Sequence, residues 1–517
     1  MTMGGERDFD AVVIGAGFGG LGAALRLAEG GARVALCEAL AYPGGCASTF
    51  SRRGARYETG ATLFSGLGEG QFLRQLRDRY APELRLDFPD PVVELRAPGL
   101  SLPIPKDRDV LINALCALPG APQARLRAFF AEQGRVAAGL WGLFNDPALL
   151  PPWDLGGFAR LVGRAPGLVE LVRLMGRPLG AAVRRHGLEG FLPLRIYLDA
   201  VCQITVQAAS EVAEAPFAMA AMDYYFQGAG HVHGGIGQLA WALARGVEAQ
   251  GGHFYSACRV KSIRREAGRW AVEARGETLR APLVITNLLP QDLSALMGAA
   301  TGASPRLDRL GEAVAGGWSA AMLYLRIDPL ACPRPEAHHV ELVMDPSRPF
   351  THGNHLFCSV SAADEERAED GARTVTISTH VSIPELLALP PEGQGERMRQ
   401  VHETMRQTLA ALAPELHAGR RAEMTASPRT WQRFTRRAQG LVGGVPRTAG
   451  LHHYTNFWPS AVAPGLYLVG DSVFPGQSAL ATALGGHKLG AYLSRGRPAP
   501  SVSLSPRPAD VSPRHDP

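Results

Sequence analysis

Cysteine is scarce in this chain, and the few cysteines are scattered. An odd number of dispersed thiols without a Cys-x-x-Cys pair argues against a disulfide framework and against a structural zinc site. Such thiols are typical of reduced cytosolic proteins, so we predict a cytoplasmic location and no metal site. The seven cysteines among 517 residues stand at positions 37, 46, 116, 202, 258, 332 and 358.

Blocks of like charge and long uninterrupted apolar segments are also missing. The net charge is +5 and the arginines are spread along the chain, so no nucleic-acid partner is predicted. The best candidate for a membrane span, residues 11–28, contains five glycines and Arg26 and has no signal-peptide features. Any contact with membrane lipid would therefore be peripheral, and the sequence leaves such a contact open.

What the chain does contain is a glycine-rich segment between a predicted strand and a predicted helix. Residues 10–38 have the pattern strand, glycine turn, helix, strand, and the turn has the spacing G-x-G-x-x-G. Gly15 permits the tight turn, Gly17 lets a pyrophosphate approach the N-terminus of the helix, and Gly20 lets helix and strand pack closely. Glu38, at the end of the next strand, is placed to bind ribose hydroxyls and disfavours a 2′-phosphate, so NADP is not predicted.

More distant segments bear on the choice between NAD and FAD. Gly44 and Gly45 form a second glycine turn, which an ordinary Pro-Gly turn also explains. Asp471 ends an apolar strand, where a buried carboxylate is costly unless a ligand such as a ribityl chain needs it. Gln477 and Ser478 then open a helix whose N-terminal amides can face the flavin edge where negative charge develops on reduction. Together these segments favour FAD.

The same segments carry a resemblance to a known family. Residues 10–63 and 465–493 resemble the phytoene desaturase-like flavoproteins, and within them the branch of carotenoid cis–trans isomerases, carotenoid desaturases and retinol saturases. The similarity extends over nearly the whole chain apart from the tail. Many relatives have a basic residue where this chain has Cys46. Desaturases that work on phytoene usually show D-x-G-P-T where residues 58–62 are E-T-G-A-T, which argues against phytoene as the substrate.

The resemblance implies that FAD is held by both glycine turns and by the C-terminal strand–helix segment. The strand at 257–263 is expected to border the adenine at Val260, although a plain surface hairpin explains that strand equally well. No catalytic residue is predicted. The residues predicted to contact FAD are Gly15, Ala16, Gly17, Gly19, Gly20, Glu38, Gly44, Gly45, Val260, Gly470, Asp471, Gln477 and Ser478.

The resemblance further implies an FAD-dependent oxidoreductase that acts on a carotenoid or a related polyene. Desaturation or cis–trans isomerisation would exchange a hydride with flavin N5, and a retinol saturase-like reductase of a polyene is an alternative. The expected partners are an apolar polyene substrate and an external electron acceptor or donor, such as oxygen, a quinone or a reduced cofactor. Two further alternatives are an amine-oxidase-like flavoenzyme and a non-catalytic prenyl-binding protein of the same fold.

The order of elements predicts an α/β fold. A discontinuous Rossmann-like FAD-binding domain is combined with an inserted substrate domain of mixed β-sheet and helices. Strand alternation predicts a hairpin over 92–105, and helical spacing dominates 107–222. The predicted domains are the FAD-binding domain at 8–90, 223–290 and 440–496, the substrate domain with a helical lid at 91–222 and 291–439, and a disordered tail at 497–517.

Several side chains admit two interpretations from sequence. His231 and His233 can act as a general acid or base, although histidines around a glycine turn are more often solvated loop residues. Cys46 can form a covalent or redox link or can be a small buried thiol. The apolar helices between 126 and 176 either form a lipid-facing lid at a tunnel entrance or pack in the core, because amphipathic helices look the same in both cases.

Overall fold

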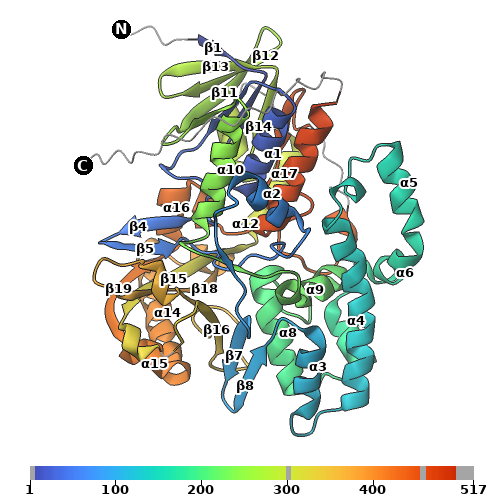
Figure 1. Ribbon diagram of the computed structural model, residues 1–517, viewed down its shortest axis with the longest axis vertical. Coiled ribbons are helices and arrows are strands. Elements are labelled where there is room, and N and C mark those ends of the chain that lie inside the picture. The colour runs from blue at the N-terminus through green and yellow to red at the C-terminus, as the bar shows by residue number, and fades with distance from the viewer. Residues whose placement is uncertain (1–5, 299–303, 333, 455–460, 496–517) are drawn as a thin grey trace.

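The computed structural model describes residues 6–298, 304–332, 334–454 and 461–495, and Figure 1 shows the arrangement of their helices and strands. The protein has the predicted α/β fold, with a parallel sheet and its helices above a mixed sheet that is accompanied by a group of helices. The predicted tail at 497–517 lies outside the described residues. No helix within the described ranges is both long enough and apolar enough to cross a membrane.

A five-stranded parallel sheet explains the position of the first glycine turn. Its central strand is β2 (Ala11–Ile14), all four residues of which are buried, as expected for an apolar strand covered on both faces. The glycine turn therefore begins at the carboxyl edge of the sheet, where ligands bind in such folds. The order across the sheet is β10 (His253–Tyr255), β3 (Val34–Cys37), β2, β14 (Leu283–Thr286) and β20 (Leu466–Leu468).

Helices α1 (Phe18–Glu29) and α17 (Ala479–Leu493) pack side by side on one face of this sheet (Figure 1). Their close approach depends on small residues, since a methyl group placed on Gly486 would overlap the carbonyl oxygen of Gly19. The first and last parts of the described chain therefore form one layer. Two further helices pack beside them, α2 (Phe72–Tyr80) and α10 (Gly237–Ala249).

A small sheet covers the other face of the parallel sheet. Because side chains alternate along a strand, Val12 and Ile14 of β2 share a buried cluster with Trp270, whereas Val13 packs on the side of α1. Helices α11 (Pro290–Met297) and α12 (Pro305–Ala315) contribute to the same cluster. The order in the small sheet is β1 (Glu6–Asp8), β13 (Glu277–Ala281), β12 (Arg269–Ala274) and β11 (Val260–Glu266).

The second large sheet has seven strands and is mixed. Its order is β19 (Arg420–Ala426), β15 (Trp318–Ile327), β18 (Arg373–Ser382), β17 (His355–Val360), β16 (His338–Val343), β7 (Val93–Ala97) and β8 (Leu100–Ile104). The predicted hairpin at 92–105 is confirmed as the pair β7–β8. The helices that follow or cover this sheet are α13 (Ile383–Leu387), α14 (Pro391–Leu412), α15 (Pro414–Ala418) and α16 (Pro428–Thr435).

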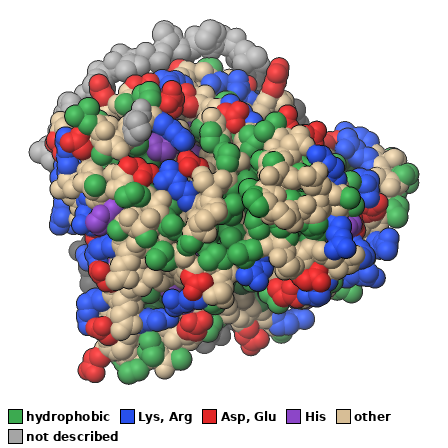
Figure 2. Space-filling view, turned by 90° about the horizontal axis from the view of Figure 1, so that it is seen from below, with side chains coloured by type: hydrophobic (Ala, Val, Ile, Leu, Met, Phe, Trp, Pro, Cys, Tyr) green, Lys and Arg blue, Asp and Glu red, His purple; other side chains and the backbone are tan. Residues whose placement is uncertain are grey.

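The predicted helical region at 107–222 is confirmed, and it lies beside the mixed sheet (Figure 1). Its helices are α3 (Arg108–Ala117), α4 (Gln123–Phe144), α5 (Leu155–Gly163), α6 (Ala165–Leu174), α7 (Leu179–Arg185), α8 (Leu192–Thr205) and α9 (Ala215–Met222). Two short strand pairs are β4 (Thr49–Arg52) with β5 (Ala55–Glu58), and β6 (Leu86–Asp87) with β9 (His231–Val232). Seen from below, hydrophobic side chains gather near the middle of the face, among charged groups of both signs (Figure 2).

The strands of the two large sheets come from different segments of the chain. Every strand of the parallel sheet comes from a predicted FAD-binding segment, and every strand of the seven-stranded sheet comes from a predicted substrate segment. The exact domain boundaries stay a prediction.

Candidate functional site

A cavity of about 850 Å³ is lined by residues of both large layers. This volume lies in the upper part of the range of roughly 300–1,000 Å³ that is usual for ligand clefts. One part of the cavity is bordered by the glycine turns and strand ends of the parallel sheet. The other part is bordered by α4, α8, α9 and the mixed sheet. The cavity can therefore hold a cofactor and a substrate side by side.

The first glycine turn borders the cavity at the carboxyl end of β2. Gly15 has a φ of +94°, a conformation that glycine adopts without strain, and Gly17 and Gly19 line the cavity. The backbone amides that open α1 thus face a space suited to an anion. Gly20 does not line the cavity. A methyl group there would overlap the carbonyl oxygen of Gly15, so Gly20 has the packing role expected from the motif.

Glu38 lies at the end of β3, beside this turn. Its carboxylate accepts hydrogen bonds from the backbone amides of Ala16 at 2.7 Å and Leu40 at 2.9 Å. Burial raises the pKa of Glu38, and these hydrogen bonds oppose that change. Each carboxylate oxygen keeps a further lone pair, so a ribose hydroxyl can still donate to it. Val260, which begins β11, also lines the cavity.

The second glycine turn lies against the first, and Gly44, Gly45 and Gly17 all line the cavity. Gly44 donates its amide hydrogen to the carbonyl of Ala16 at 2.8 Å, which fixes the two turns relative to each other. Gly44 and Gly45 both have positive φ, at +105° and +62°. A methyl group placed on Gly45 would find one atom within 4 Å, the Cα of Gly17 at 3.9 Å. Both turns therefore present bare backbone to the same part of the cavity, as a pyrophosphate lying alongside them requires.

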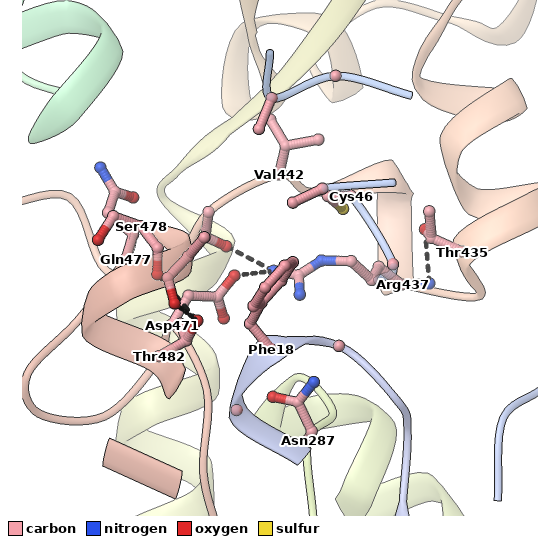
Figure 3. Close-up of a pocket in the computed structure, with 18 of the residues that line it drawn as sticks. Phe18, Cys46, Asn287, Thr435, Arg437, Val442, Asp471, Gln477, Ser478 and Thr482 are labelled. Carbon is pink, nitrogen blue, oxygen red and sulfur yellow. Dashed lines mark hydrogen bonds and ion pairs between the residues drawn. The ribbon is translucent and has the colours of Figure 1, made fainter. Parts of the chain in front are cut away.

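Asn287 belongs to this part of the site, and our sequence analysis missed it. It follows β14 directly, and its side chain lies against the first glycine turn (Figure 3). A methyl group on Gly17 or Gly19 would overlap its amide, and one on Gly470 would be within 2.5 Å of its oxygen. Gly470 thus packs behind the lining. The sequence feature that could have identified Asn287 is its position as a polar residue directly after a buried strand, at the edge of a parallel sheet where ligands bind.

Asp471 follows β20 and is not an isolated buried charge. Its carboxylate forms an ion pair with Arg437, in which Nη2 and Oδ2 are 2.7 Å apart (Figure 3). Both side chains are 17% exposed and both line the cavity. Asp471 therefore lines the cavity, as expected of a ligand acceptor. Its partner Arg437 is not predicted from the sequence, because a short Arg-Arg segment does not distinguish a buried arginine from a solvated one.

The segment before α17 carries two of the predicted residues. Ser478 has a φ of +104°, an unusual conformation for a residue with a side chain, and its hydroxyl caps the helix by accepting from the amide of Ala481 at 3.0 Å. Gln477 donates its side-chain amide to the carbonyl of Thr205. Both Gln477 and Ser478 line the cavity (Figure 3).

Two buried acceptors at this point have no donor among the described residues. They are Oε1 of Gln477 and Oε1 of Gln207, and a methyl group placed on Gly443 would touch both side chains. Gln207 is 4% exposed and lines the cavity, yet no sequence motif marks it. Buried polar atoms are nearly always hydrogen-bonded, so these oxygens call for a ligand that donates. The N–H and hydroxyl groups of a flavin nucleotide supply such donors, and the lining thus fits FAD.

Arg447 is a buried cation on the substrate side of the cavity. It donates to the carbonyl of Pro475 at 3.2 Å, contacts Nδ1 of His453 at 3.2 Å, and lies over the ring of Phe217 at 4.6 Å. Burial lowers its pKa to about 10, so it remains charged at neutral pH. Within the described residues no carboxylate oxygen is within 4.0 Å of this guanidinium. It therefore carries positive charge into the cavity wall.

The remaining candidates from sequence do not reach the cavity, apart from Cys46. His231 is buried and pairs with Glu365, at 3.1 Å, so the interpretation as a solvated loop residue is wrong for it. His233 contacts Asp87 at 3.4 Å. Burial raises the pKa of the Cys46 thiol, which favours the inert interpretation. Across the described parts of the chain, no group of three or more His, Cys, Asp or Glu is arranged to hold a metal ion.

Comparisons with known proteins agree with this geometry. A family model described as flavin containing amine oxidoreductase matches residues 18–484. The chain is 27% identical to the chloroplastic prolycopene isomerase of Arabidopsis thaliana over 93% of this chain and 82% of that protein. It is 28% identical to a neurosporene-forming phytoene desaturase of Cereibacter sphaeroides over 54% and 52% of the two chains. A solved structure of a redesigned putrescine oxidase has a TM-score of 0.63 at 15% identity, covering 95% of this chain and 99% of that one.

Proposed function

This chain belongs to the family of flavin-containing amine oxidoreductases and is an FAD-dependent enzyme, and on that premise we propose that its substrate is a carotenoid or a related polyene. The proposed reaction is desaturation or cis–trans isomerisation. When bound, the flavin supplies hydride exchange at its N5 atom. The similarity to proteins named prolycopene isomerase and phytoene desaturase supports this substrate class.

The observation that carries the proposal is the apolar wall of the cavity opposite the cofactor side. It is built from α4, α8, α9 and the mixed sheet, and includes Leu140, Trp141, Ile204, Phe217 and Phe357. A polyene has no charged group, so it can be held only by apolar contact along its length. Such a wall also excludes water from the reacting carbon atoms.

The charges around the cavity oppose an amine substrate. The acids among the described lining residues are Glu38, Asp292 and Asp471, and none of them lies on the apolar wall. The charged group on that side is the guanidinium of Arg447, which repels an ammonium ion but tolerates a neutral hydrocarbon. The backbone-lined part of the cavity beside both glycine turns suits a cofactor, which argues against the non-catalytic prenyl-binding alternative.

The experiment is an anaerobic incubation of the FAD-loaded protein with cis-lycopene, with phytoene and with a retinoid, in both the oxidised and the dithionite-reduced state. We expect a new product from at least one polyene. Desaturation bleaches the flavin absorbance at about 450 nm, whereas isomerisation leaves it unchanged over a full cycle. Reduction of a polyene by the reduced protein would identify the saturase alternative.

Putrescine and benzylamine serve as the matched amine probes. Bleaching by either amine, together with no product from any polyene, would contradict the proposal. Adding oxygen, a quinone or a reduced nicotinamide afterwards identifies the electron acceptor or donor.

Helices α5 and α6 expose apolar side chains that bear on how an apolar substrate reaches the cavity. On α5 the side chains of Leu155, Phe158 and Val162 are 91%, 54% and 56% exposed, and their spacing places them on one face. Val169 and Val172 of α6 are also more than half exposed. The interpretation of this segment as core is therefore wrong for these exposed side chains, although it holds for most of α4 and for Leu171 and Leu174 of α6.

We propose that this face contacts a lipid surface with anionic headgroups. Arg164 and Arg173 are exposed beside the apolar side chains and have no ion pair within the described residues. Apolar side chains combined with arginines are typical of helices that lie in a membrane interface. α4, which ends at Phe144 and contacts α6, contributes Trp141 and Phe144 to the cavity wall, so the face adjoins the proposed path of the polyene.

The double substitution Phe158→Ser and Val162→Ser is expected to reduce cosedimentation with vesicles about tenfold or more, because each lost apolar side chain removes roughly 1.5–3 kcal/mol of burial. The vesicles contain phosphatidylcholine with and without phosphatidylserine, and the wild type should prefer the anionic ones. Leu330→Ser, at a site 93% exposed on another part of the surface, is the matched control. Equal binding by the wild type and the double variant would refute the surface.

A further inference from the structure

Arg437 reaches the cavity from a part of the chain remote from both glycine turns. α16 ends at Thr435, and Arg436 then adopts a left-handed conformation with a φ of +61°. This turn sends the next residue inward, and the side chain of Arg437 extends across the cavity toward Asp471 (Figure 3). The segment that follows, 438–443, supplies carbonyl groups around the guanidinium.

Three of the five N–H donors of this guanidinium have acceptors. Nε donates to the carbonyl of Leu441 at 2.6 Å. Nη2 donates to the carbonyl of Gly443 at 2.6 Å and to the carboxylate of Asp471 at 2.7 Å. The two N–H groups on Nη1 have no acceptor among the described residues, and this atom is not sealed from the cavity. A fixed guanidinium with two free donors facing a cavity is a site for an oxyanion.

The position of these donors matches one segment of the cofactor. Arg437 is an electrostatic neighbour of Cys46, the residue directly after the second glycine turn, and of Asp471 on the other side. The guanidinium therefore lies close to both the second glycine turn and the carboxylate that fits ribityl hydroxyls (Figure 3). Burial opposes the charge of Arg437, but the negative charge and hydrogen bond of Asp471 outweigh it, and the pKa of Arg437 is raised.

We propose that Arg437 binds the pyrophosphate of FAD through Nη1 and supplies, from the end of α16, the positive charge that the side chain at position 46 lacks. Asp471 holds the guanidinium in place and accepts hydrogen bonds from the adjacent ribityl hydroxyls. Fixed by Asp471 and two carbonyls, Arg437 is pre-organised for the phosphate oxygens. This inference rests on FAD as the cofactor and is independent of the proposed polyene substrate.

The first test is Arg437→Met, which keeps most of the volume and removes the charge. We expect the dissociation constant for FAD, measured by flavin fluorescence quenching, to rise about tenfold to hundredfold, the usual effect of losing a charge-assisted hydrogen bond. Binding of ADP should weaken by a similar factor, whereas binding of riboflavin, which has no phosphate, should hardly change. Arg433→Met, on the exposed side of α16, is the matched control.

The second test moves the charge to the other element. In the double variant Cys46→Arg with Arg437→Met, the new guanidinium extends from the second glycine turn into the same part of the cavity. Most of the FAD affinity lost in Arg437→Met should then be restored. A further variant, Arg437→Met with Asp471→Asn, separates phosphate binding from the cost of an unpaired carboxylate. ADP, which has no ribityl chain, is the probe for this variant, and its affinity should stay low if the phosphate contact is what matters.

Three results would overturn the inference. One is an unchanged FAD dissociation constant in a folded Arg437→Met variant. Another is a loss of riboflavin binding with ADP binding intact, which would place the contact on the ribityl–flavin part. The third is full recovery of ADP affinity when Asp471→Asn is added to Arg437→Met. If Arg437→Met does not fold, Arg437→Lys serves instead, because it keeps the charge but loses the two-pronged geometry. Wild-type FAD and ADP affinity in that variant would equally refute the role of Nη1.

Discussion

Replacing Gly45 by asparagine is expected to give a folded protein whose FAD dissociation constant is at least about a hundredfold higher. Asparagine tolerates the φ of +62° at this position better than other residues with side chains. Gly45 lines the cavity beside Gly17, whose Cα would be 3.9 Å from the added Cβ, so a larger side chain takes up cavity space next to both glycine turns. The side chain therefore occupies space that the pyrophosphate of FAD needs, and FAD can bind only if this side chain moves away.

Flavin fluorescence quenching measures the effect, and circular dichroism checks the fold. The control is Gly99→Asn, in the turn between β7 and β8, where φ is +73° and no atom lies within 4 Å of an added methyl group. This control imposes the same backbone cost at a site remote from the cavity. Wild-type FAD affinity in Gly45→Asn would show that the cofactor does not lie against the second glycine turn.

The second large effect is expected from adding one methyl group between α1 and α17. Alanine in place of glycine inside a helix usually stabilises it by up to about 1 kcal/mol. At Gly486 the sign should reverse, because the methyl group overlaps the backbone oxygen of Gly19, which no side-chain rotation can relieve. We expect Gly486→Ala to destabilise the FAD-free protein by about 3 kcal/mol, the upper part of the range for overpacked sites.

Urea unfolding followed by circular dichroism measures this change. Gly163→Ala, in α5, is the matched control, since nothing lies within 4 Å of the added methyl group. The control should be neutral or slightly stabilised. An unfolding midpoint for Gly486→Ala equal to that of the wild type would mean that the two helices do not pack as closely as described.

The sequence was sufficient for features that depend on local pattern. The glycine turn at Gly15–Gly20, the hairpin at 92–105 and the helices from 107 to 222 all follow from spacing within a few residues, and the structure confirms them. Asp471 was identified as part of a site because a carboxylate after an apolar strand is costly without a partner.

The residues that were missed depend on contacts between distant segments. Gln207 lies beside Gly443, and Arg437 lies beside Cys46 and Asp471, although these segments are far apart in the chain. No periodicity or motif connects them, because tertiary packing brings them together. The environment of the exposed faces of α5 and α6 cannot be predicted from sequence for a related reason. Apolar residues have the same helical spacing whether the helix packs on a core, forms a lid or contacts lipid.

The packing of α1 against α17 has a consequence for synthesis of the protein. Roughly 450 residues separate the end of α1 from the start of α17, so at a translation rate of about 5–20 residues per second the first helix waits roughly 20 to 90 s for its partner. During that time the nascent chain has its first glycine turn but lacks β20, Asp471 and the helix that covers α1. The complete set of cofactor contacts therefore forms only after the C-terminal segment has been synthesised, and until then the face of α1 that packs on α17 stays uncovered by that helix.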